Sequence, residues 1–100
     1  MATSRAQQIE HRLRERLEAV HVEVVDDSAL HAGHLDAEGG GGHFRVLVVS
    51  PRFVGASRVA AQRMVYGALA DLMIRDIHAL QMQTMTPAQW NEGGTEHGTL

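Results

Sequence analysis

The sequence contains no cysteine among its 100 residues. This absence excludes disulfides, thiolate catalysis and a self-contained iron–sulfur site of the all-cysteine kind. The chain does contain seven histidines, and neutral imidazole is a common metal ligand. Any metal centre in this protein must therefore use its histidines.

Lysine is also absent, so all nine basic residues are arginines, and the formal net charge is −3. The charge is unevenly distributed, because residues 39–70 hold four arginines and no acidic residue. This local surplus could meet an anionic partner. The net charge of the whole chain, however, would not steer it to DNA.

Long apolar runs are missing as well, which argues against a transmembrane helix. The first 20 residues have no apolar segment after their basic residues, so a secretory signal is not expected. We expect a cytoplasmic protein. The length fits one compact domain, which we place at residues 1–92, with a long flexible loop at 27–42 and a disordered tail at 93–100.

Hydrophobic periodicity predicts the order helix, strand, strand, helix, strand, short helix. Ser4, Ser57 and Thr86 are the expected N-caps. Val59 is assigned to the core face of the second helix. The expected ranges are 4–19, 20–24, 44–49, 57–74, 77–85 and a short helix from residue 87.

The connections between these elements predict an α+β domain. The first two strands are joined without a helix and should be antiparallel. The second and third are joined through a helix and can be parallel, with a right-handed crossover. The expected fold is a three-stranded mixed sheet with helices covering one face.

Several sequence segments resemble the BolA family in both order and spacing. They cover nearly the whole domain, from about residue 5 to residue 91. They read HFRV (43–46) with VVS (48–50), RFVG (52–55), RMVYGAL (63–69), IHAL (77–80) and TPAQW (86–90).

The resemblance implies a fold like the class II KH domain and a non-enzymatic function. BolA proteins bind monothiol glutaredoxins and share with them a bridging [2Fe–2S] cluster, together with glutathione, in iron–sulfur trafficking and iron homeostasis. The family pattern makes His78 an iron ligand and takes the second ligand from the loop between the first two strands. Here His31 or His34 would supply it. Many members have a histidine where this chain has Gln62, which weakens any ligand role for that helix position.

The resemblance also implies an alternative, because some bacterial members are DNA-binding transcriptional regulators of stress response and morphology. The candidate contacts are Arg52, Arg58 and Arg63. The Gly-x-x-Gly loop with which KH domains grip phosphates is missing, which makes nucleic-acid binding the lesser interpretation.

Other interpretations are less specific. We interpret His43, which begins a strand beside the loop, as structural. No serine or carboxylate has a recognisable activating partner, so we expect no enzymatic activity. A stress-related scaffold that binds no metal is the third hypothesis. We expect neither a membrane nor a small-molecule substrate as a partner.

Overall fold

The computed structural model describes residues 4–27, 42–74 and 76–93. The predicted loop at 27–42, with His31 and His34, therefore lies almost wholly outside the described residues, as does most of the predicted tail. The elements are α1 (Arg5–Leu17), β1 (His21–Asp26), β2 (Gly42–Val49), the 3-10 helix η3 (Pro51–Phe53), α2 (Arg58–Ala68), α3 (Ala70–Met73), β3 (Ile77–Met85) and α4 (Pro87–Gly93).

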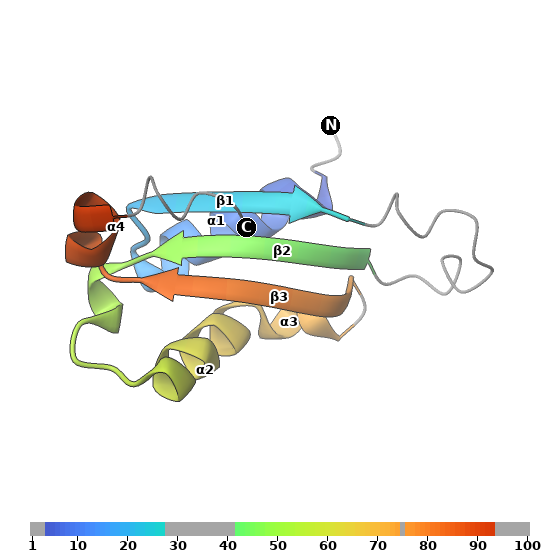
Figure 1. Ribbon diagram of the computed structural model, residues 1–100. Helices are drawn as coiled ribbons and strands as arrows, with labels where there is room; N and C mark the ends of the chain where they lie inside the picture. Colours follow the sequence, from blue (N-terminus) through green and yellow to red (C-terminus); the bar gives the residue numbers. More distant parts are fainter. Residues whose placement is uncertain (1–3, 28–41, 75, 94–100) are drawn as a thin grey trace.

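The three strands form one sheet in the order β1-β2-β3 (Figure 1). β1 pairs with β2 antiparallel, and β2 pairs with β3 parallel. Both predicted pairings and the α+β class are confirmed. The parallel register has one irregularity, because Gly42 is opposite Ile77 whereas His43 is opposite Ala79. β3 therefore carries one extra residue at this point, and that residue is His78.

α1 begins with a capping box, as its N-terminal sequence suggests. The Ser4 hydroxyl accepts from the Gln7 amide at 3.1 Å, and the Gln7 side chain accepts from the Ser4 amide at 3.0 Å. The helix ends at Leu17, two residues earlier than predicted, because Glu18 adopts a left-handed conformation with φ of 53°. Its apolar residues, spaced four apart, face the sheet.

The main core lies between one face of the sheet and the helices α1, α2 and α3. Phe44, Val46 and Val48 of β2 are its centre, with exposed fractions of 2% or less. The other fully or nearly fully buried members from the helices include Ile9, Leu13, Val65, Leu69 and Leu72. β2 is the central strand, and Leu47 and Val49 on its other face are buried as well, so its sequence is an almost continuous apolar run.

The predicted single helix over 57–74 is interrupted at Leu69, and this part of the prediction is wrong. Gly67, a weak helix former, precedes the break. The interruption allows Leu69 and Leu72 to be buried together. Val59 was also misassigned, because its side chain is 55% exposed rather than in the core.

A second, smaller cluster covers one end of the opposite sheet face. Leu47, Val49 and Met85 are buried there, with Trp90 of α4 packed on them. α4 begins as predicted: the Thr86 hydroxyl accepts from the Gln89 amide at 3.2 Å, and the Gln89 side chain accepts from the Thr86 amide at 2.9 Å. The far end of this face is not covered by α4 (Figure 1).

Candidate metal site at one end of the sheet

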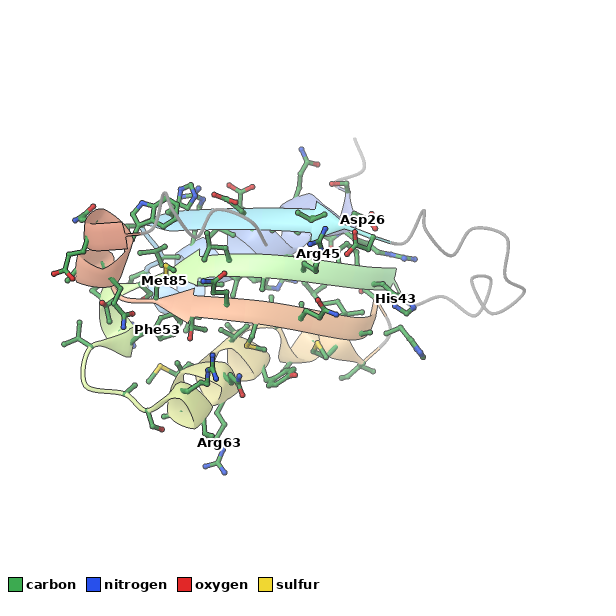
Figure 2. The ribbon with its side chains drawn as sticks, viewed as in Figure 1. Asp26, His43, Arg45, Phe53, Arg63 and Met85 are labelled. Carbon is green, nitrogen blue, oxygen red and sulfur yellow. The ribbon has the colours of Figure 1, made fainter. Side chains whose placement is uncertain are left out.

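Two histidines lie side by side at the end of the sheet opposite α4. The rings of His43 on β2 and His78 on β3 have centroids 5.2 Å apart, with an angle of 45° between their planes. Figure 2 shows His43 at this end, close to the start of β2. His78 is exposed and His43 is half-buried. The pair therefore presents two imidazole donors at an accessible position.

The parallel pairing of the strands brings these side chains together. Each histidine is the second residue of its strand, and the amino ends of parallel strands meet at the same end of a sheet. The extra residue in β3 is His78 itself. Such irregularities commonly redirect a side chain away from the regular alternation.

Backbone hydrogen bonds fix the start of β2 on both sides. The Asp27 amide donates to the carbonyl of His43 at 2.7 Å, and the Gly42 amide donates to the carbonyl of Asp76 at 3.0 Å. Next to His43, Arg45 forms an ion pair with Asp27, with 2.6 Å between Nε and Oδ2. The local charges are thus partly neutralised, and the backbone beneath the histidines is well anchored.

The predicted site residues have different outcomes. His78 lies at an exposed end of the sheet beside a second imidazole. His31 and His34 are outside the described residues, so their assignment stays a prediction. The interpretation of His43 as structural stays a prediction, and its ring lies beside that of His78. Because His43 and His78 both begin strands predicted to be parallel, their proximity could have been inferred.

Two imidazoles can supply two of the four ligands of a tetrahedral metal ion. Among the residues that the structure describes, no group of three or more histidine, aspartate or glutamate side chains could hold a metal ion. Histidine pairs do replace two thiolates on one iron of Rieske-type [2Fe–2S] clusters. The donor set therefore fits one iron of a cluster whose remaining ligands come from elsewhere.

The three arginines predicted for nucleic-acid contact are not equivalent. Arg52 pairs with Glu18, with 3.2 Å between Nε and Oε1. Arg58 and Arg63 are exposed on α2, and neither forms an ion pair within the described part of the chain. Figure 2 shows Arg63 pointing away from the sheet. Only two of the three therefore present unpaired positive charge.

The described helices include none long and apolar enough to cross a membrane. A family profile described as BolA-like protein matches residues 13–89. The chain is 42% identical over 85 residues to human BolA-like protein 1, with 84% of this chain and 62% of that protein covered. The chain thus spans less than two thirds of the length of this relative.

Two further comparisons also find BolA proteins. The chain is 38% identical over 84 residues to the DNA-binding transcriptional regulator BolA of Escherichia coli, covering 84% of this chain and 77% of that protein. The solved structure of BolA1 from Arabidopsis thaliana superposes with a TM-score of 0.76 at 33% identity, covering 89% of this chain and 98% of that one. The chain belongs to the BolA family.

Proposed function

We propose that this protein is a non-enzymatic adaptor that joins a monothiol glutaredoxin and co-ligates a bridging [2Fe–2S] cluster as cargo. The observation that carries the proposal is the adjacent pair of rings of His43 and His78 at the open end of the sheet. The predicted role for His78 rests on family resemblance, and its exposure beside a second imidazole supports that role.

The chemistry of the donor set explains why a partner is needed. The chain contributes nitrogen ligands and has no thiolate to contribute. Glutaredoxin and glutathione would supply sulfur to the other iron. Imidazole binds only when neutral, so this half of the site releases its metal more readily as the pH falls. A ligand of this kind suits transfer of a cluster better than its storage.

The second ligand is one of three histidines. His43 has the advantage of its position beside His78. His31 and His34 belong to the segment that connects β1 with β2, and its flanking residues Asp27 and Gly42 lie at this same end of the sheet. Single alanine variants of the three identify which one supports cluster binding.

The direct test mixes the protein with a cluster-loaded monothiol glutaredoxin and follows visible absorption and circular dichroism. We expect a new spectrum at a one-to-one ratio, and we expect His78→Ala to abolish it. His11→Ala is the matched control, since His11 is exposed on α1 and should leave the spectrum unchanged. An unaltered glutaredoxin spectrum with the wild-type protein would refute the proposal.

DNA-binding regulation is the second candidate function. Arg58 and Arg63 carry exposed charge without an ion pair in the described residues, and one relative is named a DNA-binding transcriptional regulator. This candidate requires both arginines, and it requires affinity that falls steeply with salt. Fluorescence anisotropy with promoter and random duplexes tests it, and equal affinity for both would count against it.

A further inference from the structure

The outer edge of β3 pairs with no further strand in the part of the chain that the structure describes. β3 spans nine residues, Ile77–Met85, and is the last strand of the sheet. Within the described residues its backbone bonds only to β2 and, at Met85, to the amide of Ser50. Its sequence, IHALQMQTM, has no charged residue and no proline. Charges and proline are the usual means by which proteins prevent strands from adding to an edge.

The other edge of the sheet is different. β1 is only six residues long and carries Glu23 and Asp26. Its first half is further occupied by contact between His21 and Trp90, whose ring centroids are 4.5 Å apart. Short length and acidic side chains are two of the features that protect an edge. An added strand is therefore favoured at β3 rather than at β1.

Apolar side chains line the β3 edge on the helix-covered face. Leu80 and Met82 pack against the main core but remain half-buried, as does Met73 of α3. Leu80 and Met82 lie opposite Phe44 and Val46 of β2, respectively. Both β2 residues are fully or almost fully buried. The side chains thus become more exposed toward the edge, and an additional strand would complete their burial.

α2 extends beyond this edge, as Figure 1 shows. Packed helices lie about 8–10 Å apart, whereas neighbouring strands are about 4.8 Å apart. Two helices therefore cover the width of roughly four strands. This sheet has three strands beneath α1 and α2, which leaves room beside β3 for one more.

One row of α2 side chains faces this space. Arg58, Gln62 and Tyr66 are spaced four apart and lie in one row. This row borders the buried face of α2, and Met64 on the other border packs against the main core. The row is therefore the border left to face the space beside β3, while Arg63 points away from the sheet (Figure 2). Tyr66 is 43% exposed, and Arg58 has no ion pair in the described residues.

We propose that the β3 edge binds one extended segment of a partner protein by strand addition. On the face that the helices cover, the segment places apolar residues over Leu80 and Met82 and an acidic residue next to Arg58, while its alternate residues point to the opposite face. Backbone hydrogen bonds to β3 supply affinity, and the alternating side chains supply specificity. A second copy of this chain does not fit, because pairing two β3 strands would bring two α2 helices into the space that holds one.

The probe is the eight-residue peptide Thr-Glu-Thr-Val-Thr-Val-Thr-Glu, acetylated and amidated at its ends, in which glutamate and valine share one face of the strand. The matched control peptide is N-methylated at every residue, which removes all of its backbone donors and blocks both of its edges. Amide exchange of the full chain is followed by NMR. We expect the first peptide to slow exchange in β3 and leave β1 unchanged, and we expect the N-methylated peptide to bind on neither strand.

Side-chain variants test the orientation. Arg58→Ala should weaken binding of the first peptide by about two- to fivefold, as for an exposed ion pair, and Tyr66→Ala should also weaken it. Arg63→Ala, on the opposite side of the same helix, should bind like the wild type. All three positions are exposed, so unchanged thermal unfolding should verify that each variant is folded.

Several outcomes would overturn the proposal. They are absence of binding, protection of β1 instead of β3, equal binding of the N-methylated peptide, and an equal loss from Arg58→Ala and Arg63→Ala. The last pattern is the one expected of DNA contacts, so the variants separate the two ideas. Dimerisation through β3 in sedimentation experiments would also contradict the choice of occupant.

Discussion

At the residue scale, Ser50 connects three parts of the fold. Its hydroxyl donates to the carbonyl of Leu17, at the end of α1, at 2.5 Å. The same hydroxyl accepts from the amide of Arg52 in η3 at 3.0 Å, and the Ser50 amide donates to Met85 of β3 at 3.0 Å. The residue is fully buried. One small polar side chain therefore joins α1 to the end of the sheet.

Replacing this hydroxyl should be costly. Ser50→Ala leaves the buried carbonyl of Leu17 without its donor, and we expect the free energy of unfolding to fall by about 1–3 kcal/mol. Urea denaturation measures the change. Ser57→Ala removes an exposed N-cap bond to Ala60 and should cost about 1 kcal/mol. A Ser50 variant as stable as the wild type would contradict this assignment.

Asp71 provides a second test at this scale, through its ion pairs. Arg12 donates from Nη2 to Oδ2 at 2.7 Å, and Arg16 approaches Oδ1 at 3.2 Å. The hydrogen bond from Arg12 is the largest cause that lowers the pKa of Asp71 from its ordinary 3.8 to about 2. The carboxylate therefore favours the folded state above the ordinary value, and this contribution is lost as the pH falls through about 2.

The resulting prediction concerns the pH dependence of stability. Asp71→Asn should lower the free energy of unfolding near neutral pH, and its difference from the wild type should shrink as the pH falls from about 4 to about 2. Urea titrations across this range measure it. Glu10→Gln, which breaks the exposed pair with Arg14, is the control and should have a smaller effect. A difference that stays constant at all pH values would exclude the ion-pair explanation.

At the element scale, α4 depends on one aromatic side chain. Trp90 covers Leu47, Val49 and Met85, and its ring stacks on His21 with centroids 4.5 Å apart and planes at 20°. His21 also contacts Glu23, with 2.8 Å between Nε2 and Oε2. His21 is half-buried in this contact.

Removing the tryptophan should release α4 from the sheet. We expect Trp90→Ala to reduce stability by about 1–3 kcal/mol, because a large, half-buried apolar surface is lost. Amide exchange should accelerate in α4 and at the carboxyl ends of β2 and β3, while exchange at the His43 end stays unchanged. Trp90→Phe should preserve much of the stability. Equal acceleration at both ends of the sheet would contradict the independence of this cluster.

The elements differed in how well the sequence predicted them. β3 was predicted with its observed bounds, since turn residues and a capped helix enclose it. The break at Leu69 was missed because the apolar spacing continues through it, and the burial of Leu69 together with Leu72 depends on tertiary packing. Val59 was misassigned because helical spacing identifies a stripe but not its limits. Here the buried residues of α2 are Ala61, Val65 and Ala68, and Val59 lies outside their face with 55% exposure.

At the scale of the whole molecule, the two sheet ends differ in their side chains. One end is closed by α4 and Trp90, and the other presents His43 and His78. The sequence predicted a histidine ligand at position 78 through family resemblance. His43 was interpreted as structural, and its proximity to His78 follows from the parallel pairing of the two strands. His31 and His34 stay predictions.

Because the chain contains no cysteine, the proposed cluster would receive nitrogen ligands from this chain and sulfur ligands from its partner. The most direct measurement is pulsed EPR of the reduced complex with glutaredoxin, with only this chain labelled with 15N-histidine. We predict a strong 15N coupling from a directly bound imidazole, lost in His78→Ala. A cluster with the same spectrum whether this chain carries 14N or 15N would contradict the account.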